Sequence, residues 1–202
     1  MKTNRLEAFS DGVIAIIITI MVLELKVPHG HTLNAIVPLY PVLLSYILSF
    51  IYVAIYWNNH HHLLYTLHVV RGNVLWANLH LLFWISLFPF TTGWMGENHF
   101  STIPTALYGF VLLMAALAYT LLQRTIISIE GENSLLKKVI GKDWKGNGSI
   151  VLYILAIGLA FISQWISLAI YVFVALMWIV PDRRIENVLY TSHKDNHSEH
   201  SS

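Results

Sequence analysis

Long apolar runs separated by short polar segments fill most of the chain and determine its predicted fold. A helix needs about 20 mostly apolar residues to cross roughly 30 Å of hydrocarbon. Runs of this kind predict six transmembrane helices, at approximately 6–25, 37–57, 73–95, 104–124, 149–164 and 166–181. We therefore expect an all-α integral membrane protein in which residues 1–185 form one six-helix bundle and residues 186–202 form a polar, disordered cytoplasmic tail.

Two features inside these runs carry further structural information. Residues 149–180 are almost continuously apolar, and only Ser163-Gln164-Trp165 interrupts them. We interpret this interruption as the turn of a tight helical hairpin; one steeply tilted helix is the alternative. Pro89 falls inside the third predicted helix, where it lacks the N–H for a helical hydrogen bond and should kink the helix.

Composition indicates a membrane protein and excludes several functions. The chain is 56% hydrophobic and only 11% charged, whereas a soluble domain usually carries about 25% charged residues. It contains no cysteine, so disulfides, thiolate metal sites and thiol nucleophiles are absent. A formal net charge of +1, without a basic stripe, gives no reason to expect a nucleic-acid partner.

The distribution of basic residues predicts the orientation of the bundle. With six crossings, eleven of the 12 Lys and Arg residues fall on the side that holds both termini, and Lys26 alone falls on the other. Cytoplasmic segments of membrane proteins carry such an excess. We therefore expect a multi-pass protein of the plasma membrane, or of the inner membrane of a cell with two membranes, with both termini in the cytoplasm.

The first apolar run begins with a carboxylate, Asp11, which makes it the most informative helix. A charged side chain at the bilayer centre costs about 2.5–3.5 kcal/mol, so a carboxylate this close to the hydrocarbon needs a reason. On a helical wheel Asp11 points roughly 140° away from Ile16. Ile16 belongs to a stripe that contains Gly12, Ile16, Thr19, Ile20 and Leu23. Asp11 should therefore face the protein's own helices when this stripe faces elsewhere. Plain helix packing would also explain the stripe.

Histidines are the remaining candidates for site chemistry. The consecutive residues 60–62 are all histidine, and on a helix they point about 100° apart, so they cannot converge on one metal ion. His80 lies within the third predicted helix beside Asn78, at a depth where polar groups usually pair inside the bundle. We therefore hypothesise a contact between the Asp11 carboxylate and the His80 imidazole or the neighbouring amide. The tail histidines have metal-like spacing but lie in a segment without predicted order: His193, His197 and His200.

The segment Arg5-x-x-x-Phe9-Ser10-Asp11 stands at the start of the first of six predicted helices. It resembles the RxxxFSD signature of the transmembrane protein 175 family, which includes bacterial relatives of the endolysosomal potassium channel. Helix count, cytoplasmic termini and short loops extend the resemblance over nearly the whole chain. Animal members carry two six-helix repeats, whereas bacterial members carry one and form tetramers. The resemblance implies a homotetrameric, potassium-permeable cation channel that needs no cofactor.

The resemblance also implies roles for residues of the first helix. Family channels line the pore with this helix, which would place Ile16 at an apolar constriction that gates by excluding water. Ile20 and Leu23 would continue the same face, and Thr19 matches a hydroxyl position that favours potassium. No TVGYG-like filter occurs, so selectivity should be modest. The signature would pack the first helix against its own subunit through Arg5, Phe9, Ser10 and Asp11, with His80 as the candidate partner.

Two other functions remain as alternatives. A secondary transporter or proton-conducting protein would use Asp11, His80 and Glu24 to bind or relay protons. A non-conducting membrane scaffold would give no ion flux. An enzyme is not expected, because the chain has neither HExxH, nor GxxxxGK[ST], nor a nucleophile-elbow pattern.

Overall fold

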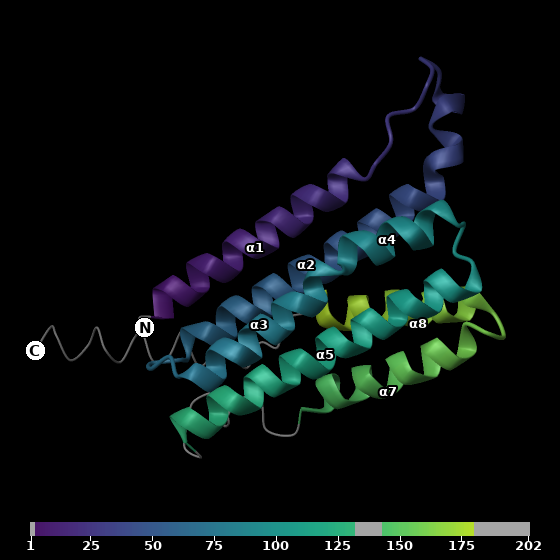
Figure 1. The fold of residues 1–202 in the computed structure, drawn as a ribbon. Coiled ribbons are helices and arrows are strands. Elements are labelled where there is room, and N and C mark those ends of the chain that lie inside the picture. Colours follow the sequence, from purple (N-terminus) through teal and green to yellow (C-terminus); the bar gives the residue numbers. More distant parts are fainter. Residues whose placement is uncertain (1–2, 132–142, 180–202) are drawn as a thin grey trace, which may run out of the picture.

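The computed structural model describes residues 3–131 and 143–179, and the regular secondary structure in these ranges is helical. Figure 1 shows an elongated bundle. The predicted tail 186–202, its histidines and the predicted domain boundary at residue 185 lie outside the described residues. The elements are α1 (Thr3–Leu23), η1 (Leu33–Ala35), η2 (Val37–Leu39), α2 (Tyr40–Tyr65), α3 (Gly72–Ser86), α4 (Phe88–Glu97), α5 (Thr102–Glu130), α7 (Trp144–Leu159) and α8 (Gln164–Ile179).

Four helical segments are long and apolar enough to cross a membrane: Thr3–Leu23, Leu33–Tyr65, Gly72–Glu97 and Thr102–Glu130. The helices α7 and α8 are also apolar, but each has 16 residues. At 1.5 Å per residue such a helix is about 24 Å long, less than the roughly 30 Å of hydrocarbon. The prediction of an all-helical membrane protein is confirmed, while length and composition identify four candidate crossings among the described residues rather than six.

The predicted hairpin between the last two helices is confirmed. The chain leaves α7 after Leu159, turns through residues 160–163 and enters α8 at Gln164. The turn therefore starts a few residues earlier than Ser163, and a single tilted helix is excluded. Ser167 at the start of α8 donates its hydroxyl to the Ala156 carbonyl over 2.7 Å, which holds the two helices together just inside the turn.

The predicted kink at Pro89 is a full interruption between α3 and α4. Leu87 separates the two helices, and Pro89 occupies the first turn of α4, where a missing N–H removes no intrahelical hydrogen bond. The helical ladder resumes where the Thr91 N–H donates to the Leu87 carbonyl over 3.1 Å. The third predicted span is thus two helices joined end to end.

The second helix extends further than its apolar run predicts. The run ends at Trp57, but α2 continues to Tyr65 and carries the polar residues 58–62 inside its last turns. Apolar content ended the predicted span too early, because His60 and His61 find polar partners on neighbouring helices and do not require the helix to stop there. In the same way α5 continues to Glu130, six residues beyond the predicted end.

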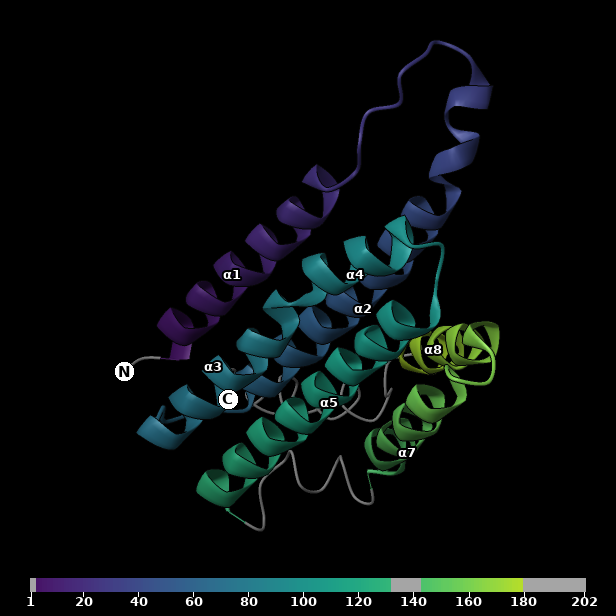
Figure 2. The same ribbon diagram turned by 45° about the vertical axis from the view of Figure 1, so that its right-hand side comes forward.

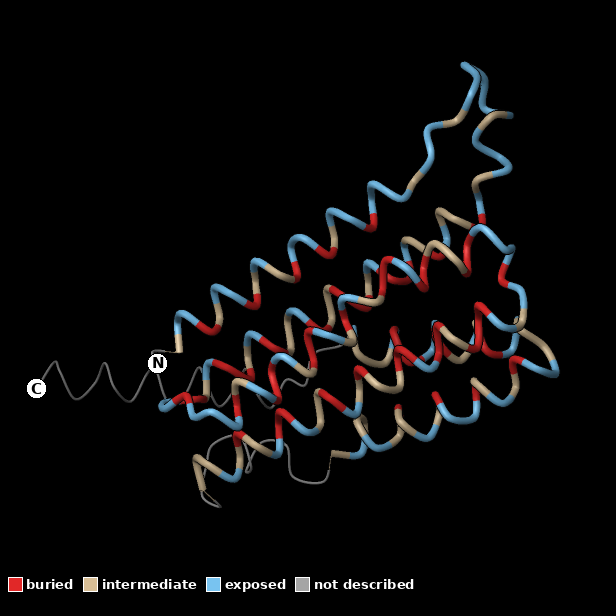
Figure 3. The backbone as a smooth tube through the Cα atoms, viewed as in Figure 1, coloured by how far each residue is buried: buried red, intermediate tan, exposed pale blue. Residues whose placement is uncertain are grey.

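The helices are arranged so that α1 lies at one edge of the bundle and the α7–α8 hairpin at the other (Figures 1 and 2). The helices α2 to α5 lie between them, and α1 contacts α2, α3 and α4. Close approach of α2 and α4 requires Gly96, because a Cβ there would overlap the backbone of Val42. Buried residues follow the inner sides of the helices in Figure 3, and the outer side of α1 is exposed.

Candidate functional site: the first helix and its supports

The two faces of α1 differ sharply in exposure although both are apolar. One face packs on the bundle through Ile14, Ile17 and Met21, which are 2–3% exposed. The opposite face contains Ile16, Ile20 and Leu23, which are 60%, 42% and 76% exposed, and Gly12 and Thr19 are exposed with them. The stripe singled out by helical periodicity is therefore the face that this chain's own helices leave uncovered.

A chain of buried hydrogen bonds joins α1 to α2 and α3. Asn78 of α3 donates through Nδ2 to Ser10 Oγ over 3.0 Å, and the Ser10 hydroxyl donates to the Leu6 carbonyl over 2.9 Å. His60 Nε2 of α2 lies 2.6 Å from Asn78 Oδ1. All three side chains are buried. Since polar groups surrounded by hydrocarbon need partners, these bonds fix the relative positions of the three helices.

The same bonds determine where the His60 ring carries its proton. Asn78 uses Nδ2 as a donor to Ser10, so its Oδ1 is the acceptor and a neutral His60 ring must donate from Nε2. The other ring nitrogen, Nδ1, is buried and has no hydrogen-bond partner among the described residues. A second N–H at this position would also need an acceptor, so the geometry favours a neutral ring with a structural role.

Two polar contacts between α1 and α2 form a ladder near the N-terminus. Glu7 Oε1 lies 2.8 Å from His61 Nδ1, and Trp57 Nε1 donates to Asp11 Oδ1 over 2.9 Å. The partners are one helical turn apart on each helix and run in opposite directions, as antiparallel helices require. The Thr3 hydroxyl adds a bond to the Leu67 carbonyl over 3.0 Å, so the first half of α1 is held by directional contacts.

The expected contact between Asp11 and His80 does not occur among the described residues. Asp11 accepts its bond from Trp57, which lies on α2. His80 instead accepts a bond from Trp84 Nε1, one turn along the same helix, over 2.9 Å. A different histidine, His60, is linked to the signature, because it bonds Asn78 and Asn78 bonds Ser10. His60 can do so because α2 continues beyond its apolar run.

The remaining signature residues lie on the outer side of α1. Arg5 is exposed and Phe9 is 52% exposed, so neither packs into this chain's own core. Thr19 is also exposed, and its hydroxyl donates to the Ala15 carbonyl over 2.9 Å. Because that bond uses the hydroxyl proton, the lone pairs of the Thr19 oxygen remain available as acceptors.

A groove of about 690 Å³ separates the exposed face of α1 from α4. Ile16, Ile20 and Glu24 line one side, and Phe90 and Trp94 are among the residues of the other. At the end of the groove Lys26 forms an ion pair with Glu97, the last residue of α4. The hydrogen bond to Glu97 and its negative charge raise the pKa of Lys26 above the ordinary value of 10.5.

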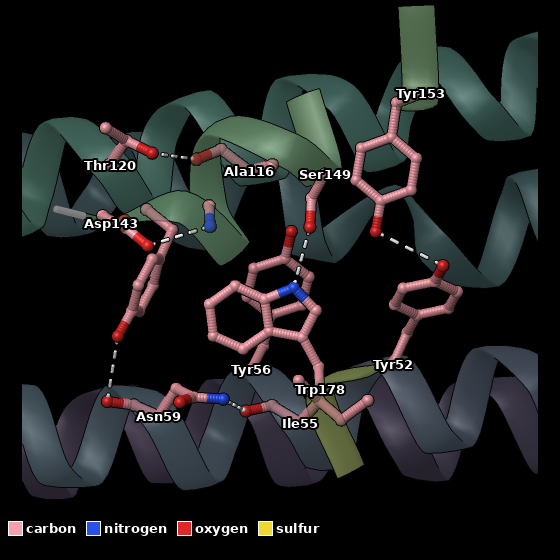
Figure 4. A pocket seen from close by; sticks show the side chains of 12 residues that line it. Tyr52, Ile55, Tyr56, Asn59, Ala116, Thr120, Asp143, Ser149, Tyr153 and Trp178 are labelled. Carbon is pink, nitrogen blue, oxygen red and sulfur yellow. Dashed lines mark hydrogen bonds between the residues drawn. The ribbon is translucent and has the colours of Figure 1, made fainter. Parts of the chain in front are cut away.

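A second, smaller cavity lies inside the bundle, between α2, α5, α7 and α8 (Figure 4). Its volume of about 40 Å³ is enough for water. Tyr153 donates to the Tyr52 hydroxyl over 3.3 Å, and Tyr52 donates to the Tyr171 carbonyl over 2.6 Å. Trp178 Nε1 donates to Ser149 Oγ over 2.8 Å. The chain of hydroxyl groups ends on the Tyr171 carbonyl, which has no proton to pass on. These groups therefore hold the helices together and do not form a continuous path for protons.

The described residues contain no group of three or more His, Cys, Asp or Glu side chains that could hold a metal ion. The consecutive histidines do not converge: His60 bonds Asn78 within the bundle, whereas His61 contacts Glu7 of α1. The spaced histidines of the tail lie outside the described residues.

Comparisons with known proteins identify the family. A family model described as endosomal/lysosomal potassium channel TMEM175 matches residues 5–89. A potassium channel of Chryseobacterium sp. (strain P1-3) is 56% identical over 189 residues, covering 94% of this chain and 98% of the relative. A potassium channel of Chamaesiphon minutus is 29% identical over 186 residues, covering 84% of this chain and 89% of the relative.

A solved structure resembles the whole bundle. The crystal structure of a lysosomal potassium-selective channel TMEM175 homolog from Chamaesiphon minutus superimposes with a TM-score of 0.78 at 28% identity. The match covers 89% of this chain and 97% of the other. The sequence signature, the relatives and the shared fold agree, and this chain belongs to the TMEM175 family of ion channels.

Proposed function

We propose that this chain forms a potassium-permeable cation channel of the plasma membrane, in which α1 of each copy lines the pore. Membership of a potassium channel family supports permeation of potassium rather than an enzymatic activity. The observation that carries the placement of the pore is the exposed apolar face of α1, which contains Ile16, Ile20 and Leu23. The described helices of this chain leave that face largely exposed.

An apolar ring on this face explains how the channel would close. Copies of Ile16 brought around one axis would form a narrow constriction with no polar group to hold water, and such constrictions gate by dewetting. The sequence resemblance supports four copies. Native mass spectrometry of the detergent-purified protein tests the stoichiometry, and a mass of one or two chains would contradict a pore built from four copies of α1.

Thr19 is the proposed determinant of the preference for potassium. Its hydroxyl proton bonds the Ala15 carbonyl, so the oxygen is oriented by its own helix and presents lone pairs on the exposed side. A ring of such oxygens would replace part of the water shell of a dehydrating cation. Thr19→Val keeps the shape but removes the oxygen, and it should lower the potassium over sodium permeability ratio while current persists. An unchanged ratio would contradict this role.

We also propose six crossings with both termini in the cytoplasm. The helices α7 and α8 are short, but together they form an apolar hairpin that returns the chain to its starting side. The C-terminal ends of α2 and α5 then face the same side of the membrane as the start of α1, and Figure 1 shows these three helix ends at the same end of the bundle. Labelling of single cysteines placed near residues 71 and 30 by an impermeant reagent tests the orientation.

The decisive experiment compares two isoleucine-to-asparagine variants in liposomes. Ile16→Asn places an amide in the proposed constriction, so it should raise potassium flux and relax discrimination against sodium. Ile154→Asn makes the same chemical change on α7, where the side chain is similarly exposed at 55% but lies away from α1, and it should leave flux unchanged. Equal behaviour of the two variants would argue that another surface lines the pore.

A transporter or proton relay through Asp11, His80 and Glu24 has less support. Asp11 bonds Trp57, His80 bonds Trp84 on its own helix, and Glu24 follows the far end of α1. No described contact joins the three groups. Flux that saturates and requires a coupled proton gradient would favour this alternative over a channel.

A further inference from the structure

The exposed stripe of α1 ends in a carboxylate. The Glu24 N–H donates to the Ile20 carbonyl over 3.2 Å, so the chain keeps its helical path one turn beyond Ile20. Glu24 is exposed and lines the same groove as Ile16 and Ile20. Gly93 of α4 lies next to this carboxylate: a Cβ added to Gly93 would be 4.0 Å from Glu24 Oε2. Because glycine has no side chain, α4 places nothing at that position between the carboxylate and the groove.

Glu24 also carries the net charge at this end of the bundle. Three segments lie here: residues 24–39, residues 97–101 and the α7–α8 turn at 160–163. Their formally charged side chains are Glu24, Lys26 and Glu97. Lys26 and Glu97 form an ion pair with each other, which leaves one negative charge per copy on Glu24.

We propose that Glu24 sets the conductance of the channel by concentrating potassium at its outer mouth. This inference rests on the proposed function, because it requires the exposed face of α1 to line the pore. Four carboxylates around one axis lower the potential for cations where they enter, and the local cation concentration rises accordingly. The effect acts through space and needs no direct coordination of the ion, so it must weaken as salt screens the charges.

The expected size follows from Coulomb's law with screening. For four charges about 10 Å from the ion path, the local potassium concentration rises about sevenfold at 0.01 M salt and about threefold at 0.1 M. At 1 M salt, where the Debye length is about 3 Å, the enrichment almost disappears. Loss of the charge should therefore reduce inward current at low salt and leave it nearly unchanged at high salt.

The absence of cysteine from the chain permits a test on a single folded protein. Glu24→Cys is reconstituted, and its current is recorded before and after reaction with thiosulfonate reagents that add a negative or a positive group. In 0.01–0.1 M KCl the unmodified variant should carry several-fold less inward current than wild type. The negative reagent should restore the current, the positive reagent should lower it further, and the differences should vanish in 1 M KCl.

The matched control removes the ion pair without changing the net charge. The double variant Lys26→Met and Glu97→Gln should conduct as wild type does at all salt concentrations. A current in Glu24→Cys that is independent of the added charge, or reduced equally at low and high salt, would overturn the role of Glu24. The result for Ile16→Asn separates the two proposals: if only Ile16→Asn alters the current, the pore placement stands and the role of Glu24 falls.

Discussion

The Asn78→Leu substitution is predicted to destabilise the bundle more than any change at an exposed polar residue. Asn78 makes two buried hydrogen bonds, with His60 Nε2 at 2.6 Å and with Ser10 Oγ at 3.0 Å. Leucine has a similar size, so the change removes the amide without leaving a large cavity. Ser10 keeps its bond to the Leu6 carbonyl, but the His60 N–H loses its acceptor.

The expected magnitude follows from that one orphaned donor. A buried donor without a partner costs about 1–3 kcal/mol, whereas polar pairs between membrane helices average about 0.6 and reach about 1.7 kcal/mol. We therefore expect a loss of about 1–2 kcal/mol. For a chain of this size it should lower the melting temperature by about 2–8 °C. Thermal unfolding followed by tryptophan fluorescence in detergent measures this directly.

Two further variants make the reasoning refutable. His60→Leu combined with Asn78→Leu removes donor and acceptor together, so the double variant should be no less stable than Asn78→Leu and should recover part of the loss. His80→Leu is the matched control: its bond to Trp84 lies within one helix and is only partly buried, so the loss should stay below about 0.5 kcal/mol. Equal losses of stability for Asn78→Leu and His80→Leu would show that the unpaired His60 N–H does not determine the cost of Asn78→Leu.

Three other predictions concern individual polar side chains. Trp57→Phe removes the donor to the signature carboxylate and should cost no more than about 1 kcal/mol in a thermal melt, since Trp57 is 46% exposed. Tyr52→Phe loses two buried hydroxyl contacts and should cost about 1–2 kcal/mol, more than Tyr119→Phe, which loses one bond of 3.3 Å. The raised pKa of Lys26 means that its ion pair stabilises below pH 10.5 and that this stabilisation is lost as pH rises through the higher folded value. The melting-temperature difference between wild type and Glu97→Gln should therefore be constant near neutral pH and close above pH 10.5; a difference that persists there would contradict the ion pair as its source.

Apolar runs predicted the helical class and the hairpin, and Pro89 predicted a kink that the structure shows as an interruption, because each has a direct physical signal along the chain. Apolar runs reveal helices, and a proline inside such a run cannot complete the hydrogen-bond ladder. The end of α2 was predicted too early for an equally physical reason. Polar residues at a helix end look like a boundary in the sequence, and only tertiary partners show that His60 and His61 belong inside the helix.

In the candidate site, too, the sequence predicts local geometry but not the tertiary partners. Periodicity placed Ile16 and Asp11 on different faces of the first helix, which the structure also separates, because both positions lie on one helix whose geometry is known. The partner of Asp11 depends on how α1 and α2 are aligned along each other. A pair of contacts, Glu7 with His61 and Asp11 with Trp57, records that alignment. The partners are four residues apart on each helix, and this spacing is present in the sequence. It predicts the contacts only once α2 is known to be helical to Tyr65.

The polar contacts that hold α1 are confined to one half of it. Among the described residues, its side-chain hydrogen bonds and ion pairs to other helices and loops come from Thr3, Glu7, Ser10 and Asp11. From Gly12 to Leu23 the helix touches the bundle through apolar packing, which has no preferred direction. Directional bonds therefore fix the N-terminal half of α1, whereas apolar packing holds its C-terminal half. In the proposed pore, a small rotation there would move Ile16 and Ile20 sideways without breaking a directional bond, and this would change the width of the proposed constriction while the fold stays intact.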